Sequence, residues 1–265
     1  MLTAVRHRIF AVAYMVGRGC ERAAQLFFYA AAGATRLDDL RRAIKREWDV
    51  AGQLGWDQHV YTGLLPWEDA FYSKYLEPGE RVLVVGCGTG RELVALLERG
   101  FRADGADVAP ECAKLARQAL AARGLTGEVH AAAIEDLPLQ GEFDAIIFAT
   151  LVYSLIPQLD RRVAALLRVA RHLRPGGRVL VTYVPRTGRP PRPVLTKLAR
   201  AVAALTGADW RPEYGDVLIP AGGGKMFTYF EHRFLPAEVE REIRSAGLRV
   251  LAHETRDEGR LVAVP

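Results

Sequence analysis

The sequence predicts an α/β protein built on a doubly wound, mostly parallel seven-stranded sheet with helices on both faces. From residue 78 onward, short β-branched runs alternate with amphipathic stretches, and a glycine-rich loop joins the first of these strands to its helix. Residues 1–77 precede this alternation and predict an N-terminal helical cap. We therefore expect a cap (1–77) and one main domain (78–265), with an irregular insertion at about 185–230 before the last helix.

The composition is that of a folded globular protein. Half of the 265 residues are hydrophobic and 25% are charged, which excludes a disordered or collagen-like chain. The net charge of +5 is uneven: residues 51–150 carry 8 Lys and Arg against 15 Asp and Glu, whereas residues 151–200 carry 11 against one. Because the basic segments do not interleave Lys and Arg with aromatic residues, we expect no nucleic-acid partner.

The cysteines and the N-terminus bear on metals and location. The three cysteines form no CxxC pair, so we expect neither a disulfide framework nor a metal site. The longest uncharged N-terminal run covers residues 23–35, which is shorter than the roughly 18 residues a membrane-spanning helix needs. Arg18, Glu21 and Arg22 interrupt the region where a signal-peptide cleavage site would lie. The expected location is the cytoplasm.

The N-terminal region predicts mainly helices. Residues 4–32 indicate one or two amphipathic helices, residues 37–50 a charged helix, and residues 67–76 a short one. The aromatic segment between the last two contains Tyr61, a candidate for binding a substrate. The first stretch is apolar and basic enough to contact a membrane surface, but packing on its own domain is the favoured interpretation.

The main domain predicts alternating strands and helices. Expected strands cover residues 81–85, 101–107, 128–133, 143–149 and 179–184, followed near the end of the chain by 249–253 and 261–264. Expected helices cover residues 91–100, 110–123, 160–173 and 236–247, with a further apolar helix near 195–205 inside the insertion. Strands separated by helices predict parallel neighbours.

The strongest motif is VLVVGCGTG at residues 82–90, where a buried strand runs into glycines at the start of a helix. Glycine is needed where a ligand lies against the main chain, and the helix starting near Gly90 directs free N–H groups toward it. Asp107 ends the next strand, where a carboxylate can accept both ribose hydroxyls of a nucleoside. Arg91 stands where a triphosphate-binding loop needs Lys, and the glycines are closer together than in the dinucleotide fingerprint. The loop therefore suits a ligand that lacks a pyrophosphate.

Together these motifs resemble the class I (Rossmann-like) S-adenosylmethionine-dependent methyltransferases. The resemblance covers about residues 78–177 closely and 230–265 more loosely. It depends on VLVVGCGTG and on GADVAP (105–110), EDLP (135–138), Phe143-Asp144 and LRPGG (173–177). It implies S-adenosylmethionine as cofactor, S-adenosylhomocysteine as product, and methyl transfer by in-line displacement.

The resemblance also assigns roles to cofactor-binding residues. It implies that Gly86, Cys87 and Gly88 line the methionine end of the cofactor, and that Asp107 binds ribose. It further implies that Val108 packs on adenine, that Ala133 and Ile134 edge the ring, and that Ala149 lies under the sulfonium.

Two positions depart from the family pattern. Val84 and Ala133 stand where the family often has acidic residues, which help to hold the cofactor's ammonium and to read the adenine amino group. Glu135 is a candidate to replace the second carboxylate. These losses leave open a non-catalytic cofactor-binding or interaction module of the same fold.

Candidate catalytic residues lie past the sheet's carboxyl edge, where such folds bind ligands. Tyr153 and His232 are candidates both for catalysis and for substrate binding, alongside Tyr61. The alternatives are a packed aromatic wall for Tyr153 and a structural role for His232. We expect a small-molecule acceptor with an O, N or S nucleophile, and a monomer or homodimer. The basic segment 151–200 raises the hypothesis of an anionic acceptor, and a lipid acceptor also remains open.

Overall fold

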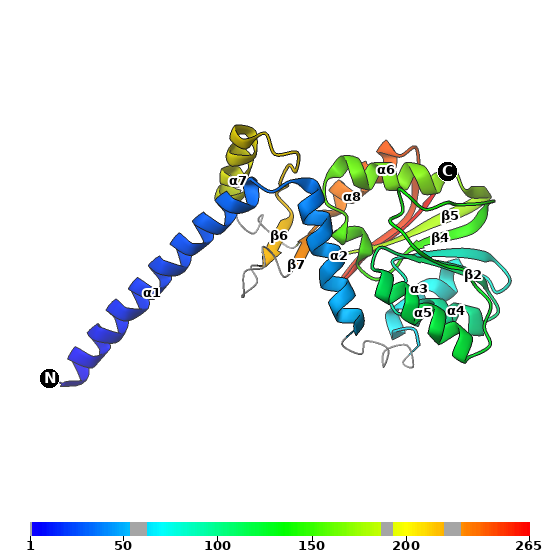
Figure 1. Cartoon of the computed structure of the whole chain (residues 1–265), viewed down its shortest axis with the longest axis horizontal. Helices are drawn as coiled ribbons and strands as arrows, with labels where there is room; N and C mark the ends of the chain where they lie inside the picture. Colours follow the sequence, from blue (N-terminus) through cyan, green and yellow to red (C-terminus); the bar gives the residue numbers. More distant parts are fainter. Residues whose placement is uncertain (1, 54–62, 187–192, 220–228) are drawn as a thin grey trace.

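A seven-stranded sheet lies at the centre of the computed structural model, which describes residues 2–53, 63–186, 193–219 and 229–265 (Figure 1). The strand order is β3-β2-β1-β4-β5-β9-β8. The strands are β1 Arg81–Val85, β2 Arg102–Asp107, β3 Val129–Ala131, β4 Phe143–Phe148, β5 Leu173–Tyr183, β8 Arg249–Thr255 and β9 Gly259–Val264. Strands β3 to β5 pair in parallel, and β9 runs antiparallel to both β5 and β8. The predicted doubly wound, mostly parallel sheet is confirmed.

Strand β5 begins earlier than the sequence predicts. Its register against β4 shifts between Phe143 and Ala145, because Phe143 pairs with Leu173 whereas Ala145 pairs with Arg178. Gly176 within this irregularity has a positive φ of 79°. The Pro-Gly-Gly sequence at 175–177 therefore forms a bulge inside one long strand.

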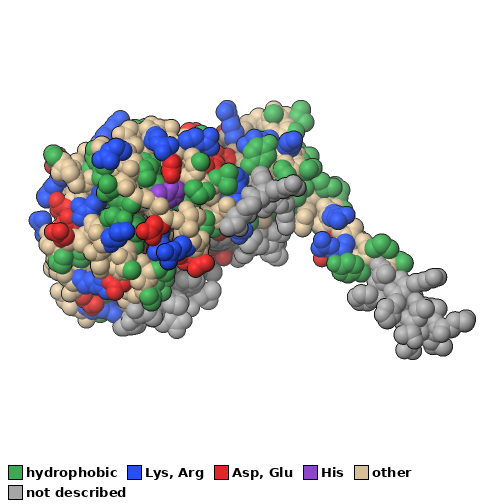
Figure 2. Space-filling model, turned by 180° about the vertical axis from the view of Figure 1, so that it is seen from behind, with side chains coloured by type: hydrophobic (Ala, Val, Ile, Leu, Met, Phe, Trp, Pro, Cys, Tyr) green, Lys and Arg blue, Asp and Glu red, His purple; other side chains and the backbone are tan. Residues whose placement is uncertain are grey.

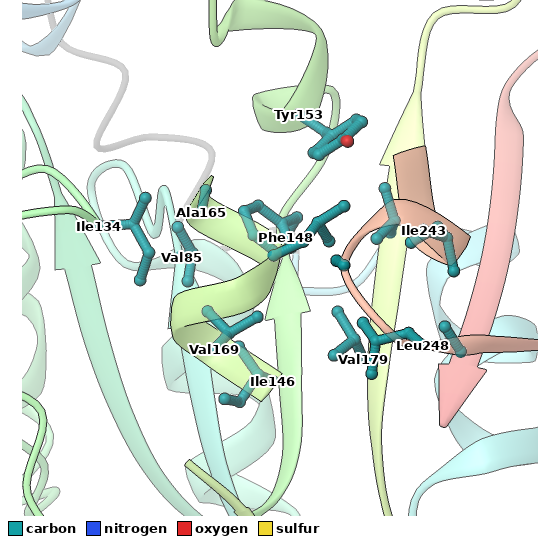
Figure 3. Packing of buried hydrophobic residues seen from close by; sticks show 14 of the residues in the cluster. Val85, Ile134, Ile146, Phe148, Tyr153, Ala165, Val169, Val179, Ile243 and Leu248 are labelled. Carbon is teal, nitrogen blue, oxygen red and sulfur yellow. The ribbon is translucent and has the colours of Figure 1, made fainter. Parts of the chain in front are cut away.

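Helices cover both faces of the sheet. α3 (Pro66–Tyr75), α4 (Arg91–Glu98) and α5 (Pro110–Ala122) pack on one face, and α6 (Leu159–Ala170) and α8 (Pro236–Ser245) on the other. Alternate residues of β1 serve the two layers: Val82 and Val84 face the first group, whereas Leu83 and Val85 face the second. Figure 3 shows the second layer, with Phe148 of β4 packed near Ala165 and Val169 of α6.

The N-terminal region forms two helices. α1 (Leu2–Gly33) extends away from the rest of the molecule, and α2 (Leu37–Gln53) lies beside the sheet (Figure 1). Among the α1 side chains that the structure describes, from residue 12 on, those of about the last two turns are covered; there a Cβ on Gly33 would lie 2.3 Å from the Ala199 carbonyl oxygen. The expectation that this helix packs on its own domain is therefore met only at its C-terminal end.

The insertion before α8 contains more regular structure than the sequence predicts. It holds α7 (Pro193–Thr206) and a separate antiparallel pair, β6 (Asp216–Ile219) and β7 (Tyr229–His232). Each of these strands has only four residues, too few for a clear alternating pattern. A third apolar cluster joins the end of α1, α2 and the insertion through Ala32, Leu40, Trp210, Leu218 and Phe230.

Candidate functional site

A cavity of about 200 Å³ lies at the carboxyl ends of β1, β2 and β4, beneath α2. Its lining is mostly apolar. The lining residues are Arg41, Ile44, Trp48, Val85, Gly86, Gly88, Ala106, Asp107, Val108, Cys112, Ala132, Ala133, Ile134, Glu135, Thr150, Val152, Leu155, Ile156, Pro157 and Arg161. This is the edge at which open α/β sheets bind their ligands.

The glycine loop forms one wall of the cavity. Gly86 and Gly88 have φ values of +74° and +54°, in the region that favours glycine. A Cβ on Gly86 would lie 2.2 Å from Cγ2 of Val152, whereas a Cβ on Gly88 would meet no atom within 4 Å. The main chain at Gly88 therefore borders open cavity space, where a ligand can lie directly against it.

Asp107 is a buried carboxylate at the end of β2. Its two oxygens accept hydrogen bonds from the N–H groups of Gly88 and Ala109, each at 2.8 Å. Burial raises the pKa of Asp107, and these two hydrogen bonds partly oppose that rise. The loop and the carboxylate thus hold each other in place, and both line the cavity.

The predicted cofactor residues fall into two groups. Six line the cavity: Gly86, Gly88, Asp107, Val108, Ala133 and Ile134.

The other three predicted cofactor residues, Cys87, Gly90 and Ala149, lie behind the lining. Gly90 precedes α4 and packs against Ala116, and the N–H of Ala149 donates to the Val85 carbonyl. Burial raises the pKa of the Cys87 thiol well above its ordinary value, so this residue is a neutral packing group.

Helix α2 contributes lining residues that sequence reasoning missed. Arg41, Ile44 and Trp48 follow one another at intervals of three and four, which places them on one face of the helix. The Cys112 thiol lies 3.4 Å from the Trp48 carbonyl oxygen, so this end of α2 is anchored on α5. The sequence spacing of these three residues could have shown that they share a helix face, but it could not show which part of the protein that face contacts.

The charged groups in the lining include two arginines. Arg161 forms an ion pair with Glu135, and Arg41 lies 3.8 Å from Asp38. Glu135, the candidate to replace the carboxylate missing at Ala133, is thus engaged by Arg161. The cavity combines an apolar wall with two arginines, on α2 and α6, and with the two carboxylates Asp107 and Glu135.

A second charged cluster lies behind Thr150. Glu68 is fully buried. Its carboxylate accepts hydrogen bonds from both terminal nitrogens of Arg91, one at 2.6 Å, and from the Thr150 hydroxyl. Glu92 is also buried, and its oxygens lie 2.7 Å from the Tyr72 hydroxyl and 3.0 Å from the Thr150 hydroxyl. Burial raises the pKa of Glu92; burial would also raise that of Glu68, but hydrogen bonds from Arg91 and Thr150 bring it below its ordinary value.

The structure places Tyr153 away from the cavity. Its side chain is fully buried, its hydroxyl donates to Glu242 at 2.5 Å, and its ring stacks on Phe234 at 5.3 Å between centroids. Figure 3 shows its hydroxyl above the apolar layer, beyond Phe148. The described lining of the cavity contains its neighbour Val152 instead.

His232 is also buried and lies outside the described cavity lining. Its Nδ1 lies 2.7 Å from Asp216, and its Nε2 lies 3.4 Å from Glu238. Burial would lower the pKa of His232, but the hydrogen bond with Asp216 and the nearby carboxylate of Glu238 raise it to about 9. The ring is therefore protonated near neutral pH and has no lone pair with which to act as a base.

Ligating atoms of Glu213, Asp216 and His232 lie within 4.8 Å of one another, close enough for a metal site. Two cations already neutralise these carboxylates, because Arg162 lies 2.8 Å from Glu213 and His232 is protonated. The cluster therefore fits a buried ion network better than a metal centre. Tyr61, the remaining candidate, lies outside the described residues.

The geometry permits one kind of chemistry in particular. A loop open to direct contact and a carboxylate at the neighbouring strand end can hold a nucleoside, and α2 and the apolar wall border the space beside it. The arrangement can thus hold two reactants side by side, which is what a displacement reaction needs.

Comparisons with known proteins agree with this geometry. Residues 82–177 match a family model described as a methyltransferase domain. The ubiquinone biosynthesis O-methyltransferase of Xanthomonas axonopodis pv. citri is 29% identical over 220 residues, which cover 82% of this chain and 81% of that protein.

Two solved structures share the fold. The 1,6-didemethyltoxoflavin-N1-methyltransferase of Burkholderia thailandensis, with bound 1,6-didemethyltoxoflavin and S-adenosylhomocysteine, has a TM-score of 0.60 at 17% identity over 86% of this chain and 90% of that one. A SAM-dependent methyltransferase of Methanosarcina mazei has a TM-score of 0.58 at 19% identity over 76% and 97%. The matching domain, the similar sequences and the strand order together show that this chain is an enzyme of the class I S-adenosylmethionine-dependent methyltransferases.

Proposed function

We propose that this enzyme transfers a methyl group from S-adenosylmethionine to an oxygen of a small phenolic acceptor that carries negative charge. The observation that carries the proposal is the pairing of Asp107 with the open glycine loop at one end of the cavity. The choice of oxygen is supported by the O-methyltransferase relatives. The anionic character is supported by Arg41 and Arg161 in the lining.

The residues present fit the cofactor. The space beside Gly88 would be filled by any side chain, and Asp107 keeps unused lone pairs for ribose hydroxyls. Val108 and Ile134 offer apolar contact to a purine ring. When bound, S-adenosylmethionine supplies a methyl group on a positively charged sulfonium.

The carboxylate missing at Val84 has a substitute on other elements. Val84 is fully buried beneath the sheet surface and cannot reach a ligand. Glu68 and Glu92 meet at Thr150, which lines the cavity, and Arg91 provides one positive charge against these two carboxylates. We assign to this cluster the attraction of the cofactor's ammonium, with the Thr150 hydroxyl as the contacting group.

The acceptor side needs no strong base. Two guanidinium groups close to a phenol lower its pKa by favouring the phenolate, so the proton can leave before transfer. Tyr153 and His232 then act as positioning residues: they fix the short 3-10 helix η2 (Val152–Leu155) and β7, and take no proton from the acceptor. Helix α2 excludes water through Ile44 and Trp48.

The test combines cofactor binding with turnover. We expect Asp107→Ala to weaken S-adenosylmethionine binding at least about a hundredfold by calorimetry, because it removes the ribose acceptor and frees the glycine loop. Asp104→Ala, on the same strand but paired with Arg81 away from the cavity, should bind normally. Methyl transfer from labelled cofactor should favour carboxylated phenols over neutral phenols and over amines. Normal binding by Asp107→Ala, or preferred transfer to nitrogen or to uncharged lipid quinols, would contradict the assignment.

A further inference from the structure

From residue 12 to residue 27, helix α1 has an apolar surface that the described parts of the protein do not cover. All side chains from residue 12 to residue 24 are exposed, and α1 projects from the molecule as a separate rod (Figure 2). Several of them are large and apolar: Val12 is 55%, Met15 64%, Val16 61% and Phe27 78% exposed. Exposed apolar groups of this size gathered on one element mark a binding surface.

The apolar side of α1 points away from the body. Tyr29 and Ala32 are buried against the insertion and α7, so they define the side that faces the protein. Val12, Val16 and Phe27 follow at intervals of four and eleven residues, which places them on the opposite side of the helix. The described residues thus leave this side uncovered from residue 12 to residue 27.

The charge of α1 is strongly positive. The helix contains four arginines, Arg6, Arg8, Arg18 and Arg22, against the single acid Glu21. The uncharged run 9–16 lies between the two pairs of arginines. None of the described helices is long and apolar enough to cross a membrane.

We propose that α1 docks this enzyme on an anionic lipid surface, with Val12, Val16 and Phe27 entering the acyl boundary and with Arg18 and Arg22 contacting phosphates. A lipid surface can cover the whole apolar side of α1. A second copy would instead bring two arginine-rich helices together, and their positive charges would repel each other. The basic charge therefore favours anionic lipid over self-association. This docking does not depend on the proposed acceptor, because the surface lies outside the cavity.

The experiment is co-sedimentation of the full chain with vesicles. We expect it to pellet with vesicles that contain phosphatidylglycerol and to remain largely in solution with phosphatidylcholine alone. Val12→Asp with Val16→Asp should reduce partitioning by more than about a hundredfold, because two charges then face the acyl region. Arg18→Gln with Arg22→Gln should reduce it about thirtyfold, since each basic residue near an anionic surface contributes about 1 kcal/mol.

A matched control uses an exposed apolar residue elsewhere. Leu251→Asp on strand β8, whose side chain is 51% exposed, should leave partitioning unchanged. All variants should bind S-adenosylmethionine normally, since the substituted part of α1 does not touch the described body of the protein. This measurement also separates a failed docking proposal from a failed cofactor assignment.

Equal pelleting with neutral vesicles, or no pelleting with anionic ones, would overturn the proposal. A dimer by light scattering that Val12→Asp with Val16→Asp converts to a monomer, with no vesicle binding by wild type, would assign the face to a second copy.

Discussion

The cofactor side of the main domain and the insertion side of the molecule are built in different ways. On the cofactor side, Gly86, Gly88 and Asp107 come from two adjacent strands within 22 residues, and backbone hydrogen bonds hold them together. On the insertion side, His232 and Asp216 join β7 to β6, and the insertion attaches to the rest of the protein through the Glu213–Arg162 ion pair and through apolar contacts of Leu218 and Phe230. The first arrangement depends on backbone geometry, and the second also on the balance of buried charges.

The buried charges join residues that are far apart in the sequence. Arg162 on α6 contacts Glu242 on α8 and Glu213 in the insertion, 80 and 51 residues away. Its guanidinium also lies 5.0 Å from the Phe234 ring centre. Burial would lower the pKa of Arg162, but the two carboxylates raise it further above its already high value, so the side chain stays charged. Removal of one member should therefore leave uncompensated charge inside the protein.

The largest expected effect tests this difference directly. Arg162→Met should lower the free energy of unfolding by about 3–5 kcal/mol, because Glu242 and Glu213 lose their cation while they remain buried. Urea denaturation measures the change. Arg171→Met, at the exposed end of the same helix, should alter stability by less than about 0.5 kcal/mol.

A double variant makes this prediction sharper. Arg162→Met with Glu242→Gln should recover part of the lost stability, because one of the stranded charges is gone. A loss below about 1 kcal/mol in the single variant would mean that buried charge does not hold the insertion in place.

The next effect is a dependence of stability on pH through His232. Its pKa is about 9 in the folded protein and near 6.5 when unfolded, so its stabilising effect is complete below pH 6.5 and is lost as the pH rises through 9. We expect the free energy of unfolding to fall by about 2 kcal/mol between pH 6.5 and pH 8.5. Unfolded cysteine thiols ionise at about pH 8.5, and burial raises the pKa of Cys87 and Cys112 in the folded protein, so these thiols add to the fall only at the upper end of this range.

Two substitutions identify the group that titrates. His232→Gln keeps a donor for Asp216 but carries no charge, so it should flatten the profile between pH 6.5 and pH 8.5. His172→Gln, whose ring lies near the Gly141 carbonyl at the surface, should keep the wild-type slope. An unchanged slope in His232→Gln would show that other groups cause the pH dependence.

The same contrast explains what the sequence could predict. The glycine loop and Asp107 are recognisable because strand, turn and carboxylate follow in a fixed local order. The roles of Tyr153 and His232 could not be assigned, because burial and partners such as Glu242 and Asp216 depend on contacts between distant segments. Arg41, Ile44 and Trp48 share a helix face that periodicity reveals, yet only the tertiary structure shows that this face closes the cavity. The short strands β6 and β7 gave too little periodicity to be recognised.

The smallest predicted effect is on the cofactor side, where we assign to Glu92 and Glu68 behind Thr150 the role of the acidic residue that is missing at Val84. Glu92→Gln preserves size and leaves Arg91 paired with Glu68, but removes a negative charge behind Thr150. We expect binding of S-adenosylmethionine and S-adenosylhomocysteine to weaken about tenfold, or about 1.4 kcal/mol, because both carry the ammonium. Methylthioadenosine lacks the amino-acid part and should bind equally to both proteins. The exposed Glu98→Gln on the same helix serves as the matched control. Equal weakening for methylthioadenosine would mean that Glu92 supports the loop rather than the ammonium, and that the cofactor side depends on local geometry alone.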